Sequence, residues 1–521
     1  MNQMLLQTTP STTSLRSTQS INIVWFRRDL RLLDSQIVHL ATTNQNPTIF
    51  VFCVDPWFYN QPQIGWKRVH FLFESLVDLD NRLNDLGSKL TILEGNTLSS
   101  LTHLATSLQK IGLVPELYFS EDTQVRYGLE RDKQVRELFE KNNWKVMQGM
   151  SNFTTPNHKY GENWGKEYYT HQQNQLFPEP TQIINYEIMD HDRQGIVSTQ
   201  PQQLLDRFNT TNQPKSELFT GGETRAHLVL ESFLEHRSDG YHWKLSRPWL
   251  SQIGATSHLS PHIAFGTIST RVIYQRSRQK RLQINSKHAF SLKSFEERLR
   301  WRDHFNGKLV KDPSIGWQNH YPEFNSVYQF IELQGERVEY FERWKNGQTG
   351  FAMVDASMRQ LNTQGYMNFR MRAMNATFLT INCGVSWHWG AQYFMTQLVD
   401  GDVAINHWQW QMQAGITNPF SQTFRIYNPD TNMTERDPDL QYIKYWCPEY
   451  THCKTPKDVI EISKHMLDYA ETRQKNGKII SDIRKQVRER LTIQLGIIPK
   501  TSTKTPRSRA KPKKSTPLKS D

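Results

Sequence analysis

The polar segment around residue 400 is the part of the sequence best suited to chemistry. Two carboxylates, one amide and two indoles lie within 11 residues, namely Asp400, Asp402, Asn406, Trp408 and Trp410. An unpaired buried carboxylate is strongly destabilising, and Arg372 is the candidate partner. Read alone, Asp-Gly-Asp indicates a turn or a metal loop, but too few oxygen ligands follow for an EF-hand. Read with Asn406, it indicates a polar pocket for a nitrogen-rich ring, and we predict no metal site.

A run of small hydroxyl residues precedes a proline further upstream. The segment Thr256–Pro261 reads T-S-H-L-S-P and leads into a helix-like stretch. Such a run can cap a helix, and it can also offer hydroxyl and backbone N–H groups to a phosphate. On this segment alone, a plain helix cap is the better supported of the two interpretations.

Basic and aromatic side chains share a helical face in the segment Phe295–Phe305 (FEERLRWRDHF). The residues at helically adjacent positions are Arg298, Trp301, Arg302 and Phe305. This face suits stacking on bases and pairing with phosphates, but a solvated charged face with its aromatic rings in the core fits equally well. Nearby, Arg370 and Arg372 follow a predicted helix start.

Composition narrows the class of protein. The chain has 521 residues with a formal charge of +12, and no window has the roughly 18 uninterrupted apolar residues of a membrane span. Its four cysteines are too scattered for a disulfide scaffold, which favours a reducing compartment. Residues 500–521 hold eight basic residues and one acid. A polyanion such as nucleic acid suits this charge, although solubility alone could also explain it.

The elements that position these residues fall into two predicted domains. Five short apolar runs within residues 21–150 have the composition of buried parallel strands: Ile21–Phe26, Thr48–Val54, Lys89–Leu93, Glu116–Phe119 and Trp144–Met147. A leucine stripe between residues 72 and 86 predicts a helix that ends at Gly87. Strand–helix alternation predicts a doubly wound parallel sheet, although no G-x-G-x-x-G follows the first strand.

The remaining ranges complete the predicted organisation. Residues 1–20 are expected to be a disordered leader; an organelle transit peptide shares this composition, but the stretch holds one arginine. Residues 151–215 are polar and read as an interdomain linker. Residues 216–495 have helical periodicity, contain ten of the 15 tryptophans and predict a large all-α domain, with helices at 223–236, 291–309 and 354–361. Residues 496–521 are predicted to be a disordered basic tail.

Taken together, these segments resemble the photolyase/cryptochrome flavoprotein family. The resemblance covers roughly residues 21–450 in order and spacing, through VWFRRDLR (24–31), residues 256–265, Trp301-Arg302, GQTG (347–350), DASMRQL (355–361), residues 400–402 and FRIYNP (424–429). Any one motif is weak, whereas the ordered set is specific. The resemblance implies an N-terminal α/β antenna domain and a C-terminal helical domain that binds FAD.

The resemblance also implies roles for individual residues. Those expected to grip the FAD phosphates are Tyr241, Thr256, Ser257, Leu259 and Ser260. Those expected to border the flavin are Phe295, Arg302, Gly401 and Asp402, with Arg372 paired to Asp400. Asn406 would lie beside flavin N5 and stabilise the reduced cofactor. Trp408 and Trp387 match the proximal and middle members of a tryptophan electron chain.

Light-driven repair is the activity that the resemblance implies. Reduced FAD donates an electron to a pyrimidine dimer flipped out of the DNA stack, and flipping is easier for a damaged base that is poorly stacked. The residues expected to contact DNA are Arg298, Trp301, Phe369, Arg370 and Arg425. Stacking on a rim aromatic contributes about 1–3 kcal/mol per base, which is enough to offset the flip.

Several positions depart from the family pattern. Arg298 stands where dimer photolyases carry a lesion-binding glutamate, and Phe369 where they carry an asparagine. His304 and Asn368 do not supply the histidine pair of 6-4 photolyases. The distal electron-transfer position falls near residues 332–334, which are not aromatic. The candidate replacements are Trp389, Tyr393, Tyr328 and Tyr340. Only three cysteines lie in the helical domain, so we predict no four-cysteine iron–sulfur cluster.

These observations lead to one functional prediction and its rivals. We predict a light-dependent lyase that repairs cyclobutane pyrimidine dimers, with a cryptochrome-type photoreceptor or a 6-4 photolyase as alternatives. A second, antenna chromophore of folate or deazaflavin type is expected. The expected partner is damaged DNA, or a signalling protein for a cryptochrome, with no membrane contact. We expect a monomer in the cytoplasm or nucleoid, or in an organelle or the nucleus of a eukaryote.

Overall fold

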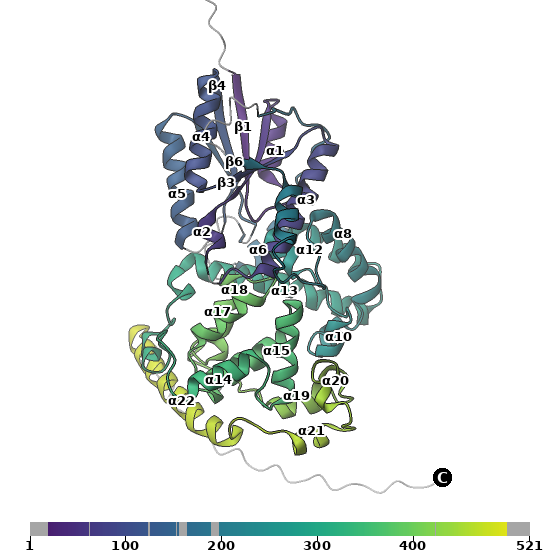
Figure 1. Ribbon diagram of the computed structural model, residues 1–521, viewed down its shortest axis with the longest axis vertical. Coiled ribbons are helices and arrows are strands. Elements are labelled where there is room, and N and C mark those ends of the chain that lie inside the picture. The colour runs from purple at the N-terminus through teal and green to yellow at the C-terminus, as the bar shows by residue number, and fades with distance from the viewer. Residues whose placement is uncertain are drawn as a thin grey trace, which may run out of the picture.

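The computed structural model describes residues 19–61, 63–122, 126–152, 154–155, 164–188, 197–421 and 424–496. They form an α/β domain that lies against a larger helical domain (Figure 1). Gln19 and Ser20 belong to the first strand, which corrects the predicted end of the leader. The rest of the predicted leader and residues 497–521 of the predicted tail lie outside the described residues.

The α/β domain is built on a six-stranded sheet in the order β5-β4-β1-β2-β3-β6. Its strands are β1 (Gln19–Phe26), β2 (Thr48–Val54), β3 (Leu90–Glu94), β4 (Leu113–Ser120), β5 (Lys145–Gly149) and β6 (Val197–Thr199). The first five are parallel, which confirms the predicted doubly wound sheet. Strand β6 pairs antiparallel with β3. It was not predicted, because a strand of three residues leaves no alternation to read.

Alternate residues of each strand pack on opposite faces of the sheet. Val24 and Phe26 face helices α1 (Gln36–Thr43) and α3 (Trp66–Asp85), whereas Ile23 and Trp25 face α4 (Thr97–Lys110) and α5 (Arg126–Lys141). The predicted leucine stripe forms the buried side of α3, which ends before Gly87 at φ 78°. Both faces are covered, as a parallel sheet requires.

The predicted linker contributes structure to both domains. Helix α6 (Trp164–Gln173) packs against α12 (Thr270–Arg281) of the helical domain, and α7 (Pro201–Asn209) packs against α3. The short helix α2 (Pro56–Tyr59) follows β2. Over the residues that the structure describes, the predicted linker 151–215 therefore joins the two domains through packed helices.

The main hydrophobic core of the helical domain lies around α15. Its helices are α8 (Glu223–Ser232), α9 (Tyr241–Lys244), α10 (Pro248–Gln252), α11 (Ser260–Phe265), α12 (Thr270–Arg281), α13 (Ser286–Lys311), α14 (Glu336–Lys345), α15 (Ala352–Gln364), α16 (Phe369–Thr377), α17 (Trp387–Gln397), α18 (Val403–Gln413), α19 (Pro429–Arg436), α20 (Gln441–Trp446), α21 (Pro456–Ile462) and α22 (Tyr469–Gln494). The predicted helix at 223–236 continues past α8 as a π-helical turn, Phe233–Arg237. Helix α22 runs along the outside of the domain (Figure 1).

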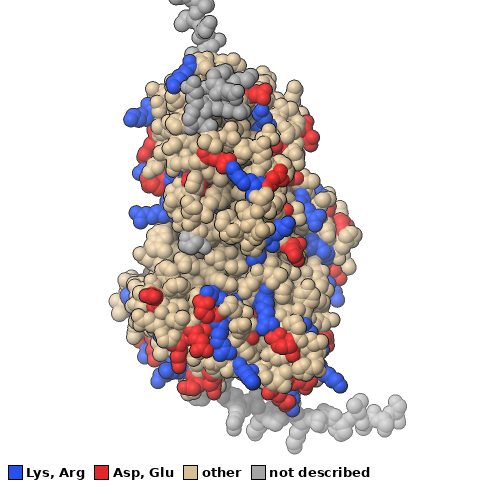
Figure 2. All heavy atoms as spheres, viewed as in Figure 1, with Lys and Arg blue, Asp and Glu red and all other residues tan. Residues whose placement is uncertain are grey.

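The surface and the cysteines add two observations. Lys and Arg side chains alternate with Asp and Glu on the face shown in Figure 2, so this face carries no large patch of one sign. All four cysteines are unpaired. Within the described ranges, no group of three metal-ligating side chains occurs, and no helix has the length and apolar character needed to cross a membrane.

Candidate functional site

The Asp-Gly-Asp segment forms the connection between α17 and α18. Nη2 of Arg372 lies 2.9 Å from Oδ2 of Asp400, which is the ion pair that the sequence predicts. Nε of Arg372 also donates to the carbonyl of Met367 at 2.7 Å. Asp402 caps α18 by accepting the N–H of Ile405 at 3.2 Å. Oδ1 of Asp400 is buried with no hydrogen-bond partner among the described residues, so the site holds an acceptor that the protein itself leaves unsatisfied.

A series of contacts connects the hydroxyl-rich loop 256–260 to this segment. Oγ of Ser251 lies 3.4 Å from Oγ1 of Thr256 and 3.4 Å from the hydroxyl of Tyr366. The guanidinium of Arg372 lies 5.7 Å from the centroid of the Tyr366 ring. The loop turns at His258, which adopts a left-handed φ of 55°. Residues about 145 positions apart are therefore brought to one site by α10 and α16, as the family resemblance requires.

Arg237 stabilises the same loop through hydrogen bonds to its backbone. Its guanidinium donates to the carbonyls of Thr256 and Ser257. Within the loop, the N–H of Leu259 donates to the hydroxyl of Ser257 at 3.4 Å. Ser260 is the first residue of α11, and Leu259 is fully buried beneath it.

Helix α13 supplies the wall between the loop and α18. Phe295 is buried against Tyr241 and Phe233, at ring-centroid distances of 5.6 and 4.8 Å. Arg302 donates to the carbonyl of Ile263 in α11 at 3.3 Å. Burial lowers the pKa of Arg302 to about 10, and the Asp402 carboxylate partly opposes that shift. The guanidinium therefore remains charged at neutral pH.

Two arginines from the α/β domain reach this site, and sequence reasoning missed both. Arg28 forms an ion pair with Asp122 and lies 3.5 Å from Oδ2 of Asp402. Arg68 of α3 donates to the carbonyl of Gly401 at 3.0 Å. A Cβ on Gly401 would stand 2.7 Å from Nη1 of Arg68, so a larger residue there would displace the end of the Arg68 side chain. Arg28 belongs to the VWFRRDLR motif, and this membership was the sequence signal that could have identified it as a site residue.

Helix α18 separates Trp408 from the face that carries Asn406. At 100° per residue, Trp410 lies one turn beyond Asn406 on the same face, whereas Trp408 points to the opposite side. Trp408 packs with Phe305 and Leu309, and its ring lies 5.0 Å from His320. The predicted roles of Asn406 and Trp408 at the flavin remain predictions, and the helical phase favours Trp410 as the indole on the Asn406 side. The four-residue spacing of Asn406 and Trp410 was the signal that could have shown this.

Trp410 begins a path of buried rings that leads to the surface. Its ring lies 6.1 Å from Trp344, which lies 5.9 Å from Phe341. Phe341 lies 5.7 Å from the half-buried Trp389. Nε1 of Trp389 donates to the carbonyl of Ile331, next to the non-aromatic segment 332–334 where the distal position was expected. Trp387 is not in contact with these rings. Its ring centroid lies 3.8 Å from that of His388 and 5.8 Å from that of His407.

Arginines and aromatic rings alternate along the outer edge of the site. Arg298 and Arg370 each lie 5.5 Å from the ring of Phe369. Arg370 and Arg425 lie 5.2 and 5.6 Å from the ring of Tyr427. Phe369 is 43% exposed. Four of these five residues come from segments that the sequence singled out separately, and Tyr427 was not assigned a role.

Comparison with known proteins identifies the family. The family model for the FAD binding domain of DNA photolyase matches residues 295–489, and the DNA photolyase model matches residues 22–174. The deoxyribodipyrimidine photo-lyase of Synechococcus sp. is 30% identical over 458 residues, which cover 84% of this chain and 90% of that protein. The chain belongs to the photolyase/cryptochrome family.

Other members of this family are similar over comparable lengths. The cryptochrome DASH of Synechocystis sp. is 30% identical over 455 residues, covering 82% of this chain and 87% of that protein. An archaeal photolyase from Sulfolobus tokodaii, solved with two FAD molecules, is 27% identical with a TM-score of 0.72 and covers 89% of this chain and 100% of its own. Membership thus includes both photolyases and cryptochromes.

An aromatic cavity lies beyond the carboxyl ends of β1 and β2, which is where doubly wound sheets usually bind ligands. Its volume is about 190 Å³, and its aromatic lining includes Trp25, Phe52, Trp57, Phe58 and Tyr59. Trp57 stacks on Tyr127 at a centroid distance of 3.6 Å. Arg28 and Asp402 also line it, so in this family member the cavity adjoins the Asp-Gly-Asp site.

Proposed function

We propose that this protein is a light-dependent DNA photolyase that splits cyclobutane pyrimidine dimers with reduced FAD. The observation that carries the proposal is the row of arginines and rings beside the carboxylate site. Guanidinium groups pair with phosphates and rings stack on bases, so such a row suits a DNA strand with one base displaced. The relative from Synechococcus sp. that bears the name deoxyribodipyrimidine photo-lyase supports the same reaction.

The residues around Asp400 fit FAD as the cofactor. The hydroxyls of Thr256, Ser257 and Ser260, with Tyr241 and the backbone at Leu259, would hold its phosphates. Phe295, Arg302 and the Asp-Gly-Asp segment would border its rings. The unsatisfied Oδ1 of Asp400 is an acceptor for a ligand N–H or hydroxyl. Reduced FAD, when bound, supplies an electron to the lesion on absorbing light.

Asn406 would orient one polar atom toward that cofactor. Its Nδ2 donates to the carbonyl of Ala391 at 2.9 Å, which restrains the amide. Oδ1 is then the acceptor that would hold a protonated ring nitrogen in place. Arg372 orients Asp400 through their ion pair, and Arg28 and Arg68 position the connecting segment from the other domain.

The DNA-contacting residues would act on the strand and the lesion separately. Trp301 is 43% exposed, and its ring lies 5.9 Å from Phe305. It offers a face on which a displaced base can stack. Arg370 and Arg425, held by Tyr427, would pair with the phosphates on either side. Trp408, which packs against Phe305 in the structure, then supports the lesion pocket rather than the electron path.

A repair assay tests the proposal. Illumination of the reduced protein with an oligonucleotide containing a cyclobutane dimer should restore intact pyrimidines, and a dark sample should not. Arg370→Gln should weaken DNA binding on the order of tenfold, because it removes a charged phosphate contact. Arg276→Gln is the matched control, since Arg276 lies on α12 in an exposed pair with Glu231. No light-dependent change in a dimer-containing strand would refute the proposed reaction.

A cryptochrome-type photoreceptor is the second candidate, and two residues favour it. Arg298 and Phe369 occupy the positions at which the resemblance leads us to expect lesion-binding polar residues, and they contact each other at 5.5 Å. The 30% identical cryptochrome DASH supports the same candidate. Normal photoreduction of the flavin without repair of a dimer or a 6-4 lesion would favour this function. Repair of the 6-4 lesion alone would favour the third alternative.

The cavity at the sheet edge is the proposed antenna site. Its planar aromatic walls suit a flat, multi-ring chromophore, and Arg27 and Arg131 in its wall are both paired with Asp132. The Sulfolobus tokodaii photolyase, whose two FAD molecules include a light-harvesting cofactor, supports a flavin-like pigment. Denaturation of the purified protein should release a second chromophore, and Trp57→Ala should lower its amount without lowering that of FAD.

A further inference from the structure

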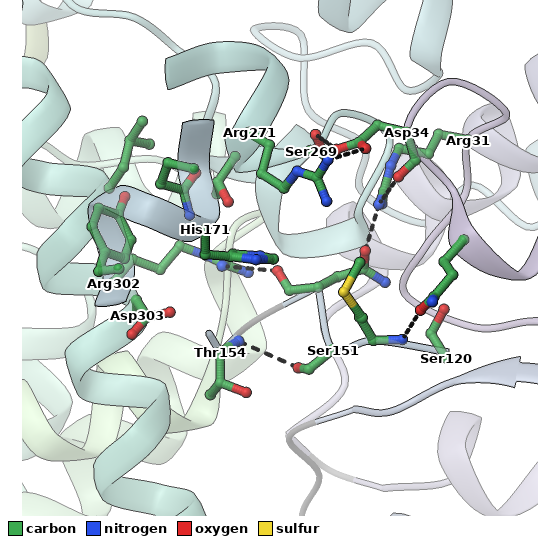
Figure 3. Close-up of a pocket in the computed structure, with 17 residues that line it drawn as sticks. Arg31, Asp34, Ser120, Ser151, Thr154, His171, Ser269, Arg271, Arg302 and Asp303 are labelled. Atoms are coloured by element: carbon green, nitrogen blue, oxygen red, sulfur yellow. Dashed lines mark hydrogen bonds and ion pairs between the residues drawn. The ribbon is translucent and has the colours of Figure 1, made fainter. Parts of the chain in front are cut away.

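A small polar cavity lies at the junction of the two domains, apart from the Asp-Gly-Asp segment. Figure 3 shows side chains that line it, and its volume is about 40 Å³. It is lined by residues of the segment after β1, the segment after β5, and helices α6, α12 and α13, among them Arg31, Asp34, Tyr168, Gln172, Arg271 and Arg302. Neither the proposed repair reaction nor the proposed antenna uses these groups, apart from Arg302.

Arg31 is a buried cation with only neutral acceptors. Arg31 is 4% exposed. Its guanidinium donates to the carbonyls of Gly266 and Asp34 and to the side-chain amide oxygen of Asn152. No carboxylate among the described residues lies within ion-pair distance of it. A buried charge without a counter-charge is strongly destabilising.

Arg271 shares the same shortage of negative charge. It is 6% exposed and lies 3.3 Å from Oδ1 of Asp34. The Asp34 carboxylate also accepts from Ser269 and from the backbone N–H of Phe177. Figure 3 shows Arg31 and Arg271 on either side of Asp34. Among the described residues, the Asp34 carboxylate is thus paired with Arg271 alone. Over the whole lining, the three arginines Arg31, Arg271 and Arg302 face the two carboxylates of Asp34 and Asp303, which leaves an excess of one positive charge.

Four buried polar atoms of the cavity lining have no partner among the described residues. They are Nε of Arg31, Nε of Arg271, the hydroxyl of Tyr168 and Oε1 of Gln172. Burial lowers the pKa of the neighbouring His171 to about 4, so this imidazole adds no charge at neutral pH. The unsatisfied groups include two N–H donors on cations and one hydroxyl.

We propose that this cavity binds a small, planar, singly charged oxyanion of the carboxylate, nitrate or bicarbonate class. Arg31 and Arg271 would donate from their Nε atoms, and Tyr168 from its hydroxyl. One buried water needs about 10–15 Å³, so the cavity holds about three or four heavy atoms. A single negative charge matches the local excess. Because the ligand would touch the α/β domain, α6 and α12 together, it would bind only when the domains are docked.

Anion-dependent stability of the full chain tests this site. The purified protein is transferred to a low-salt buffer and titrated with sodium nitrate, with sodium chloride at matched ionic strength as the comparison. Thermal unfolding should shift upward with nitrate and saturate, and chloride should produce a smaller shift. Ligand that binds only the folded state raises the unfolding temperature in this way.

Three variants locate the effect. Arg31→Met removes the uncompensated cation and should weaken nitrate binding at least about tenfold. Tyr168→Phe retains both arginines and should weaken it about threefold to tenfold, so the test does not depend on one variant folding. Arg276→Gln should leave it unchanged. Equal shifts with nitrate and chloride, or a nitrate response that survives in both Arg31→Met and Tyr168→Phe, would overturn the proposal, as would a high-resolution crystal grown in nitrate that shows only water.

Discussion

Replacement of Arg372 by leucine should remove most of the FAD from the purified protein and destabilise its fold. The side chain of Asp400 is 7% exposed and would lose its counter-charge, while its second oxygen already lacks a partner. Breaking this ion pair should lower the free energy of unfolding by roughly 2–4 kcal/mol. This is toward the lower end of what is typical for buried pairs, because the Arg372 side chain is 28% exposed. The measurements are flavin absorbance per protein and the free energy of unfolding.

Two further variants separate lost charge from lost shape. Arg372→Lys keeps the charge but not the second hydrogen bond to Met367, so it should retain part of the FAD. Arg276→Gln breaks an exposed pair and should change stability by less than about 1 kcal/mol. FAD occupancy that is undiminished in a folded Arg372→Leu protein would contradict the proposed cofactor site.

Substitution of Trp410 by phenylalanine should slow photoreduction of the bound flavin by at least about tenfold, a change of about 1.4 kcal/mol in the barrier. Trp410 lies one turn from Asn406 and its ring contacts Trp344, while the ring of Phe341 packs between Trp344 and Trp389 and bridges these two indoles without itself being oxidised. Phenylalanine is much harder to oxidise than tryptophan and interrupts this path. The measurement is the rate at which oxidised-flavin absorbance disappears under blue light with an external reductant.

Trp408→Phe is the informative comparison for Trp410. Because Trp408 lies on the opposite side of α18, its substitution should change photoreduction by less than about twofold. It should instead weaken binding of a dimer-containing strand, since Trp408 packs against Phe305 and, through it, Trp301. Thermal unfolding of both variants checks that lost packing does not mimic the effect. If Trp408→Phe abolished photoreduction and Trp410→Phe did not, the revised path would be wrong.

The position of the arginines from the α/β domain has a consequence for the proposed antenna. Arg28 lines the aromatic cavity and also lies 3.5 Å from Asp402. The aromatic cavity and the Asp-Gly-Asp site therefore share a charged wall rather than being separated by a layer of core. Because that wall belongs to both domains, docking of the domains shapes both sites together.

Local sequence patterns were sufficient for the fold class and for the composition of the site. Short apolar runs bounded by polar residues predict strands, and the five parallel strands lie where such runs occur. The Arg372–Asp400 pair also followed from the sequence, because a buried carboxylate needs a cation and the family motif supplied one. The strands depend on neighbouring residues along the chain, whereas the pair joins residues 28 positions apart and was identified through the family motifs.

Other features depended on where helices and domains pack. The family resemblance assigned Trp408 as the flavin-proximal tryptophan, whereas the phase of a continuous helix puts Trp410, not Trp408, on the side of Asn406. Arg28 and Arg68 reach the site only because the α/β domain docks on α18. The shared use of Asp34 by Arg31 and Arg271 likewise arises across that junction. Sequence determined which groups this protein carries, and tertiary packing decided which of them meet, because contacts between distant segments depend on the geometry of docking rather than on local pattern.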